Sequence, residues 1–267
     1  MAESTAPYRE VVVSREGPVA VLIISRPGKM NAINRTMRAE FISRLGELNV
    51  DSGVRAIVLR GADAQGFSSG QDLEEAKEFT LETMVTWQTD QRALFQSVRD
   101  LDKPCVLAAD GFCVGAGFQI ALCADWRIAT PKSTWGQPEV KVGLASITGA
   151  FLMELHIGRT HNTQLSLSGD LISGARAYEM GLVTELVEPN AIWSAAIERA
   201  AALGALPSNA IRLTKRRLRA TSQAGFDDAF EAGIRAQFEC YSNNEPQKMM
   251  REFFALRQRR SDAKRQA

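Results

Sequence analysis

The sequence predicts an α/β fold in which short apolar strands alternate with amphipathic helices, followed by a helical C-terminal quarter. Three observations support this class. Short apolar runs recur between segments of helical periodicity, and glycine-rich turns follow those runs. The composition, 267 residues with 45% hydrophobic and 24% charged side chains, is that of an ordinary folded domain. A sheet of this kind gathers the loops at one end of its strands, where a site can form.

The first predicted element is a hairpin over residues 10–25, where two β-rich runs flank a Gly17-Pro18 turn. A breaker-rich loop over residues 26–34 follows it. The next segment, residues 35–48, is predicted to be helical because its apolar residues recur at steps of three and four, namely Met37, Phe41, Leu45 and Leu48.

The same alternation continues through the middle of the chain. Buried strands are predicted over residues 56–60 and 105–109, and a helix over residues 81–98. A loop over residues 61–70 follows the first of these strands. A glycine-rich turn over residues 110–117 follows the second and opens a helix at about residue 118.

Beyond residue 174 the periodicity is mostly helical. Helices are predicted over residues 177–180, 192–203, 208–219 and 226–240. The basic tail, residues 251–267, is expected to be a solvated helix end that frays.

Charge and residue usage exclude several functional classes. Thirty-two Lys and Arg against thirty-one Asp and Glu leave a net charge of +1, so we expect no nucleic-acid partner. No apolar run approaches the roughly 20 residues that span a bilayer, and the N-terminal ten residues lack a signal-like apolar run. We therefore expect a cytoplasmic protein without a membrane contact. Four cysteines without Cys-x-x-Cys spacing and two histidines predict no metal site.

Two glycine-containing loops each follow a predicted buried strand and end at a helix start. They are residues 67–73, Phe-Ser-Ser-Gly-Gln-Asp-Leu, and residues 110–119, Asp-Gly-Phe-Cys-Val-Gly-Ala-Gly-Phe-Gln. Backbone N–H groups at such ends lack intrahelical partners, so they suit a carbonyl oxygen that gains negative charge. The alternative interpretation is that Gly115 and Gly117 only allow close packing of helix and strand.

A third segment, Trp135 to Leu144, places the carboxylate of Glu139 after Pro138 in an apolar setting. The chain resembles the enoyl-CoA hydratase/isomerase (crotonase) superfamily over nearly its whole length. The resemblance is carried by this segment, by the two glycine-containing loops, and by residues 25–34, 122–129 and 169–183. The resemblance implies a crotonase-like spiral of ββα units with a C-terminal helical trimerisation layer. It also implies an acyl-CoA substrate, whose coenzyme A is part of the substrate rather than a separate cofactor, and a homotrimer or dimer of trimers. We assign residues 1–200 to the spiral core and residues 201–267 to the helical region.

The resemblance places two backbone amides that stabilise an enolate on Gln71 and Ala116. It places the two glutamates of the family's hydratases on Gln119 and Glu139, so an amide replaces one carboxylate here. A Gln side chain cannot take and return a proton, which leaves Glu139 as the single acid/base. One base suffices to shift a double bond, so isomerisation is favoured slightly. Hydration by a single-glutamate hydratase or hydratase-lyase stays open.

A second departure from the family pattern lies at Ser146 and Ile147, where Pro and Gly are common. Ile147 stands where backbone helps to place water in the hydratases, and it predicts an altered acyl pocket, which Trp87, Phe118 and Trp135 could also line. The resemblance further implies coenzyme A contacts from two loops and the glycine-rich turn, at Lys29, Ala32, Ile33, Gly70, Asp72, Leu73 and Gly115. A basic segment, residues 212–219, could approach the nucleotide phosphates or could simply face solvent or a subunit.

Two other classes compete with an acyl-CoA enzyme. Some relatives of this fold bind RNA, but a net charge of +1 offers little surface for a phosphate backbone. A dinucleotide oxidoreductase would need Gly-x-Gly-x-x-Gly, and Ile120 occupies the place of the third glycine.

Overall fold

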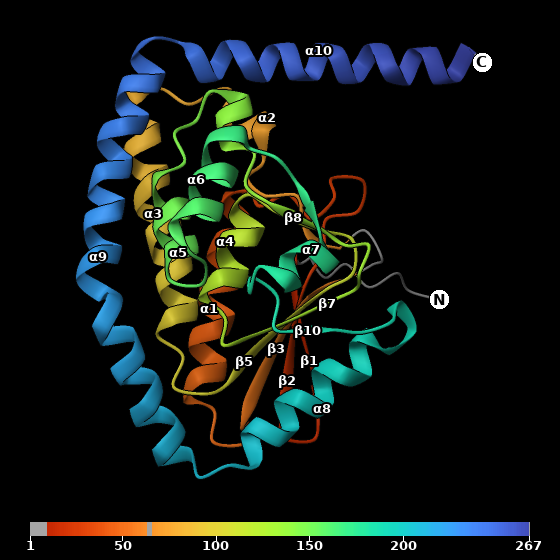
Figure 1. Ribbon diagram of the computed structural model, residues 1–267, viewed down its shortest axis with the longest axis vertical. Coiled ribbons are helices and arrows are strands. Elements are labelled where there is room, and N and C mark those ends of the chain that lie inside the picture. The colour runs from red at the N-terminus through yellow and green to blue at the C-terminus, as the bar shows by residue number, and fades with distance from the viewer. Residues whose placement is uncertain (1–9, 63–65, 267) are drawn as a thin grey trace, which may run out of the picture.

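Two β-sheets and the helices that connect their strands make up the structure, a computed structural model that describes residues 10–62 and 66–266 (Figure 1). The N-terminal residues 1–9, on which the expected cytoplasmic location rests, lie outside the described residues, as do residues 63–65 of one predicted loop. Within the described ranges, no helix combines the length and the apolar character that crossing a membrane requires.

The larger sheet contains six strands, and all but its first pair of neighbours run parallel. In spatial order they are β1 (Val11–Glu16), β2 (Val19–Ile24), β3 (Ala56–Gly61), β5 (Cys105–Ala109), β7 (Trp126–Ala129) and β10 (Glu185–Leu186). The predicted hairpin is confirmed as the antiparallel pair β1 and β2, and the two predicted buried strands are confirmed as β3 and β5.

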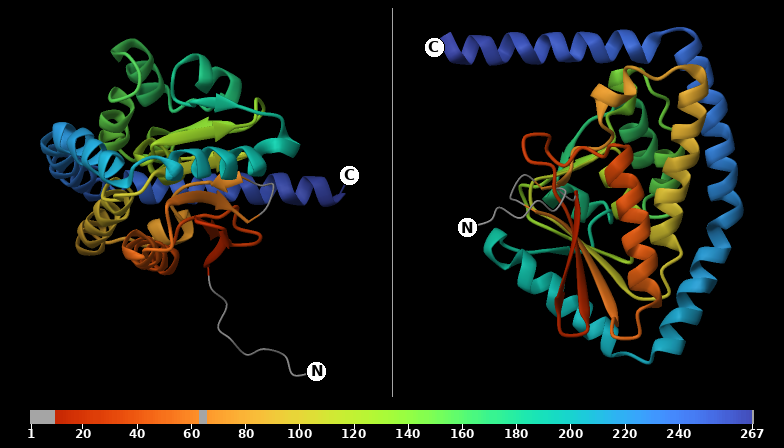
Figure 2. Two further views of the ribbon diagram at one scale, coloured as in Figure 1. Left: turned by 90° about the horizontal axis from the view of Figure 1, so that it is seen from below. Right: turned by 180° about the vertical axis from the view of Figure 1, so that it is seen from behind.

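Both faces of the inner strands β2, β3 and β5 are largely buried, which explains why these strands read as continuous apolar runs. Alternate residues such as Val21, Val58 and Val106 pack under α8 (Ile192–Ala205). Their neighbours Leu22, Leu59 and Leu107 face the main core. On that side lie α1 (Arg35–Val50) and α3 (Leu81–Arg99), and Figure 2 shows α8 on the side of the strands opposite to them.

The smaller sheet is built from strands that the sequence did not reveal. It contains β4 (Gly66–Ser68), β6 (Phe112–Val114), β8 (Thr134–Gly136) and β9 (Ile172–Ser173), the first three parallel to one another. The loop over residues 61–70 and the turn over residues 110–117 were therefore wrongly predicted to lack strands. Strands of two or three residues are too short to show an alternating pattern.

Helix α4 (Ala116–Cys123) begins two residues before the predicted start, because Gly115, which follows β6, turns the chain directly into the helix. The remaining helical segments connect the strands and cover the small sheet. They are α2 (Leu73–Ala76), η1 (Glu139–Val142), α5 (Ile147–Glu154), α6 (Arg159–Ser168), α7 (Gly174–Glu179) and η2 (Pro189–Ala191).

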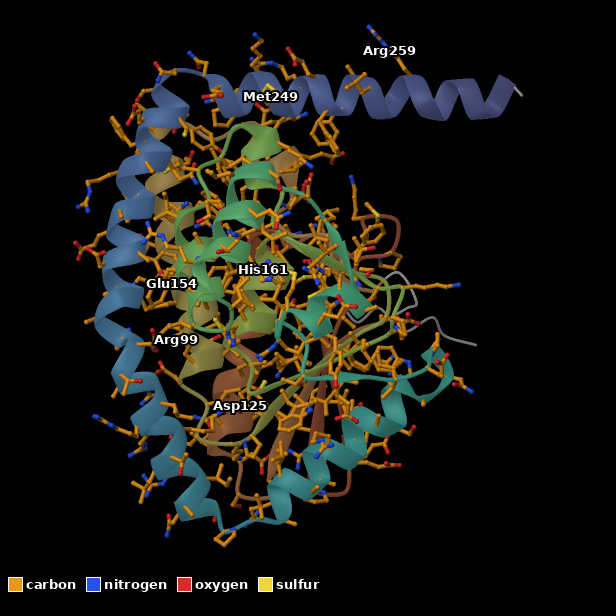
Figure 3. All side chains as sticks on the ribbon, viewed as in Figure 1. Arg99, Asp125, Glu154, His161, Met249 and Arg259 are labelled. Carbon is orange, nitrogen blue, oxygen red and sulfur yellow. The ribbon has the colours of Figure 1, made fainter. Side chains whose placement is uncertain are left out.

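The C-terminal region consists of two long helices. The predicted pair over 208–219 and 226–240 is one helix, α9 (Ser208–Ser242), which remains unbroken at Gly225; a Cβ there would lie 2.7 Å from the Phe151 ring. Residue 200, at which the two predicted regions divide, lies within α8. Helix α10 (Glu245–Gln266) leaves α9 at Asn244, crosses the top of the molecule and projects beyond it, with Arg259 pointing away from the body (Figure 3).

Candidate active site

Three loops meet at one edge of the small sheet, and each follows one of its parallel strands. Gly70 and Gln71 follow β4, Gly115 follows β6, and Glu139 follows β8. Because parallel strands end at the same edge, these loops are brought together from distant parts of the chain. They enclose a cavity of about 410 Å³, the inner lobe, whose walls include Gly70, Gln71, Ala116, Gln119, Glu139 and Ile147.

The first two loops pack backbone against backbone. Gly70 and Gly115 have φ angles of +100° and +56°, which favour glycine. A Cβ on Gly70 would lie 3.0 Å from the carbonyl oxygen of Val114 and 3.3 Å from the nitrogen of Ala116. Glycine at position 70 is therefore what lets the two loops approach this closely.

The backbone nitrogens of Gln71 and Ala116 lie on these adjoining loops. A β-bridge fixes the first loop through its flanking residues: Ile33 N–H donates to Gly70 O at 2.8 Å, and Asp72 N–H donates to Ile33 O at 3.1 Å. The N–H of Gln71 takes no part in that pairing. Ala116 is the first residue of α4, so its N–H has no acceptor within the helix.

Gly117 has the packing role that the sequence left open for both glycines. A Cβ at this position would lie 2.7 Å from the Cβ of Ser68, so glycine is what allows α4 to rest against β4. Gly115 differs, because its backbone conformation and its place beside Glu139 both bear on the cavity: a Cβ there would lie 3.6 Å from Glu139 Oε1.

Glu139 begins the short helix η1 and presents its carboxylate to the same cavity. Gln119 Nε2 donates to Glu139 Oε1 at 2.9 Å, which fixes the orientation of the carboxylate. Oε2 is buried and has no hydrogen-bond partner among the described residues. Burial raises the pKa of Glu139 to about 7, since little around the carboxylate replaces the water that would stabilise its charge.

The raised pKa has a consequence for stability. Because the folded-state pKa lies above the ordinary value of 4.5, Glu139 favours the fold in its protonated form, and this contribution is lost as the pH rises from about 4.5 through about 7. We expect Glu139→Gln, which stays neutral, to be more stable than wild type by up to about 3 kcal/mol at pH 8, with a difference that shrinks toward pH 4. Urea unfolding of both proteins across this range measures the effect, and parallel curves would contradict it.

A second hollow, the outer lobe, opens from the first and has a volume of about 520 Å³. Met30, Ser69, Gln71, Leu73 and Phe253 line both lobes. The outer lobe is also lined by three predicted coenzyme A contacts, Lys29, Ala32 and Asp72. The ammonium of Lys29 pairs with Glu74 at 2.7 Å, and both side chains are exposed.

Some predicted residues lie elsewhere than expected. Ile33 is buried in the main core and lines neither lobe; its backbone positions Gly70 and Asp72 instead. The carboxylate of Asp72 caps α2 and pairs with Arg26 at 2.8 Å, so it is already engaged. Among the candidates for the acyl pocket, Trp87 and Ile147 line the inner lobe, whereas Phe118 and Trp135 are buried in the core.

The basic segment on α9 does not reach the outer lobe. Lys215 pairs with Asp125, Arg216 with Asp102 at 2.9 Å, and Arg219 with Asp100 at 2.9 Å. Acidic side chains of the same chain thus hold these three residues against the body, and no residue of the segment 212–219 lines either lobe.

The two histidines and the cysteines take no part in the cavity walls. His156 packs with its Nε2 2.9 Å from Leu122 O, and burial lowers its pKa to about 4. Burial raises the pKa of the Cys105 and Cys123 thiols to about 12. Across the described part of the chain, no group of three His, Cys, Asp or Glu side chains is placed to hold a metal ion.

Several cavity residues escaped the sequence analysis. Gly149 lines the cavity and makes room for Gln137 behind it, since a Cβ on Gly149 would overlap the Gln137 amide; Gln137 Oε1 accepts a hydrogen bond from Gln119 Nε2 at 3.4 Å. Five other polar residues line the cavity: Gln88, Gln91, Ser146, Thr148 and Gln237. A sequence signal existed for two of them, because Gln88 and Gln91 interrupt the otherwise apolar face of the helix over residues 81–98.

Comparisons with known proteins agree with this architecture. Residues 14–261 match the family described as enoyl-CoA hydratase/isomerase. The chain is 31% identical over 248 residues to the short-chain-enoyl-CoA hydratase of Clostridium acetobutylicum, an alignment that covers 92% of this chain and 95% of that protein.

Solved structures give the same result. An enoyl-CoA hydratase/isomerase from Xanthobacter autotrophicus Py2 is 27% identical, with a TM-score of 0.83 and 94% of both chains covered. An enoyl-CoA hydratase/isomerase from Mycobacterium paratuberculosis shares the fold with a TM-score of 0.84 at 24% identity, over 92% of this chain and 98% of that one. The predicted crotonase fold is confirmed, and the chain belongs to the enoyl-CoA hydratase/isomerase family, whose enzymes act on acyl-CoA substrates.

Proposed function

We propose that this enzyme moves a proton on an enoyl-CoA thioester through an enolate, with Glu139 as its single acid/base. The observation that carries the proposal is the state of this carboxylate. Oε1 is held by Gln119, Oε2 is buried without a partner among the described residues, and the pKa of about 7 suits both uptake and return of a proton.

The N–H groups of Gln71 and Ala116 form the oxyanion hole in this proposal. The thioester carbonyl oxygen lies between them, and the Glu139 carboxylate removes a proton from a carbon beside or conjugated to that carbonyl. The electron pair left behind moves into the carbonyl, and the two amides stabilise the charge on its oxygen. One such donor contributes about 2.7–4 kcal/mol to the transition state in comparable enzymes.

Gln119 favours isomerisation as the outcome. The protonated Glu139 returns the same proton to a different carbon of the enolate, so the double bond shifts and no second base is required. Hydration would require activation of a water molecule, and Gln119, which donates to Glu139, cannot accept a proton from water. Hydration by Glu139 alone is the second candidate, and it is favoured by relatives named short-chain-enoyl-CoA hydratase and crotonyl-CoA hydratase.

The outer lobe is the proposed binding site for the coenzyme A part of the substrate. Its loop residues Lys29 and Ala32 would contact the nucleotide end, with Lys29 exchanging Glu74 for a phosphate. No cofactor beyond the substrate's own coenzyme A enters this proposal. We also propose a homotrimer or a dimer of trimers, which would give the projecting half of α10 a neighbour to pack against.

Incubation with 2-enoyl-CoA and 3-enoyl-CoA thioesters in deuterated water tests the reaction type. We expect deuterium in a product whose double bond has moved, with no gain of water by mass spectrometry. A mass gain of one water would favour hydration instead. If neither exchange nor conversion occurs with any thioester that binds, proton transfer by Glu139 is excluded.

A further inference from the structure

The inner lobe continues along helix α3, well past the residues of the proposed proton transfer. Its wall on this side is one face of the helix, formed by Trp87, Gln88, Gln91 and Phe95. Trp87 Nε1 donates to Gln71 Oε1 at 2.9 Å, so this end of the face stands beside the loop of one proposed oxyanion donor. Phe95 follows about two helical turns later, ~12 Å further along the axis. The lobe therefore extends far beyond its reacting end.

An aromatic floor closes the far end of the lobe. Phe95 of α3 and Phe230 of α9 both line the lobe, and their ring centroids lie 6.0 Å apart. Phe226 packs behind Phe230 at 5.0 Å, and none of the three residues is more than 2% exposed. These rings carry no hydrogen-bonding group, so the floor favours an apolar ligand atom.

Polar residues of the walls turn oxygen atoms into the protein rather than into the open space. Oε1 of Gln91, Oε1 of Gln237 and Oγ of Ser146 are all buried. Gln237 also donates from Nε2 to Ala145 O at 2.8 Å, so its amide is directed at the backbone. The surface that stays open to the lobe is mostly apolar. A hydrocarbon group suits such a wall, because its burial removes apolar surface from water and leaves no polar group unpaired.

The charges of the cavity exclude an ionic group on the acyl chain. The only charged residues that line the inner lobe in the described part of the chain are Glu139 and Lys141, and Lys141 pairs with Asp170 at 2.7 Å. A carboxylate or an ammonium near the aromatic floor would therefore be buried without a counter-charge.

Gly233 of α9 stands between the reacting end and the floor. Gln88 belongs to the near end of the α3 face, and Phe230, about one turn before Gly233, belongs to the floor. A Cβ at position 233 would lie 3.9 Å from Gln88 Oε1, 3.4 Å from Thr148 Oγ1 and 3.9 Å from Ile147 Cβ. An added methyl group thus fits at ordinary contact distances, whereas a longer side chain would enter the space between α3, α5 and α9.

The length of the lobe restricts the chain that fills it. A four-carbon acyl chain is shorter than one helical turn of about 5.4 Å, so it would leave the floor uncovered. Extended C–C bonds of about 1.5 Å advance a chain by roughly 1.3 Å each, and about eight to ten carbons therefore span the two turns from Trp87 to Phe95.

We propose that the preferred substrate carries an apolar hydrocarbon acyl chain of about eight to ten carbons, and that Gly233 is the residue that admits it. This inference rests on the proposed acyl-CoA function of the same cavity. It names a substrate class, medium-chain apolar acyl-CoA thioesters, and a specificity-determining residue, neither of which the reaction type specifies.

A series of acyl-CoA thioesters with four to fourteen carbons tests the chain length. Saturated, unreactive members are titrated by calorimetry, and unsaturated members are compared by kcat/KM. We expect the affinity of wild type to rise roughly fourfold with each added methylene, because each one buries further apolar surface in the lobe. The rise should end at about eight to ten carbons, where the chain meets the floor.

Gly233→Leu tests the specificity-determining residue, because its side chain would occupy the lobe short of the floor. It should bind the ten-carbon thioester about 10- to 100-fold more weakly and the four-carbon thioester within about twofold of wild type. The ratio of the two affinities is measured on one preparation, so it does not depend on the folded fraction. If Gly233→Leu fails to fold, Gly233→Ala decides, and its preferred chain should be shorter by one or two carbons.

Gly46→Leu is the matched control for these substitutions. Gly46 is an exposed glycine within α1, outside both lobes, and a Cβ there has no atom within 4 Å. This variant should keep the chain-length profile of wild type.

The two assays separate the substrate class from the chemistry. A preference for medium chains in binding without turnover would support the substrate class and contradict proton transfer by Glu139. Turnover that is fastest with four carbons, together with an affinity that does not rise with chain length, would overturn the substrate class and leave the reaction intact. An unchanged profile in the folded Gly233 variants would overturn the role of that residue, and a failure of every thioester to bind would overturn both proposals.

Discussion

Glu139→Gln is expected to lower kcat by about 10²- to 10⁴-fold, the range over which a positioned acid/base contributes. The substitution preserves the shape of the side chain, and its Oε1 can still accept the hydrogen bond that Gln119 Nε2 donates at 2.9 Å. The substitution removes the capacity of the carboxylate to take up a proton. Binding of a saturated acyl-CoA should therefore change little, so that the loss lies in kcat rather than in Kd.

Steady-state kinetics and calorimetry on the same preparations measure the two effects. Glu154→Gln is a suitable control, since this exposed residue near the end of α5 lies outside both lobes and its substitution should leave kcat unchanged. Loss of deuterium exchange in Glu139→Gln would link the fall in kcat to proton transfer. A variant that retains full turnover would show that another group moves the proton.

Gly115→Ala is expected to lower kcat by about 10²- to 10³-fold, comparable to the loss of one oxyanion donor. The φ angle of +56° and ψ of −126° at this residue are unfavourable for any side chain, so the backbone that leads into α4 must shift. That shift displaces the N–H of Ala116, the next residue. The added methyl would also lie 3.4 Å from Gly70 Cα, in contact with the other proposed donor loop.

Gly17→Ala is a matched control for the strain itself. Gly17 has a φ of +57°, and a Cβ there has no atom within 4 Å, so its substitution strains a turn remote from the cavity. Both variants should lose stability in thermal unfolding, by about 1–3 kcal/mol. Only Gly115→Ala should also lose kcat, and equal kinetics in the two variants would contradict the assignment of Ala116 as a donor.

The sequence predicted those elements that carry a long periodic signal. Strands β3 and β5 are continuous apolar runs because both of their faces are buried, and α1 and α3 have apolar residues at helical spacing. The small sheet could not be found in this way, because its strands are two or three residues long and derive their stability from tertiary pairing. The unbroken α9 was also missed, since only the packing of Phe151 against Gly225 shows why a glycine stays within the helix.

The sequence predicted some residues of the candidate site and missed others. Glycines mark where the loops at Gly70 and Gly115 approach, and the resemblance to the family placed Glu139 beside them, a proximity that the structure shows. The polar residues of the cavity wall were not foreseen as a group. Gln88 and Gln91 interrupt an apolar helix face, but Thr148 and Gln237 come from other helices that meet α3 only in the folded chain.

The donors proposed to hold the substrate carbonyl belong to the main chain, at Gln71 and Ala116, and the remaining groups belong to side chains on other elements. Substitution cannot delete a peptide N–H, proline excepted, so these two positions tolerate sequence drift as long as the loops keep their path. In the proposed mechanism the reaction type depends on the residues at 119 and 139, and the other cavity walls, contributed by α3, α5 and α9, would shape substrate choice. Reaction type and substrate choice can thus change in evolution while the oxyanion-binding loops are kept. Substitutions in the cavity wall are therefore expected to change the substrate preference without loss of the proposed chemistry.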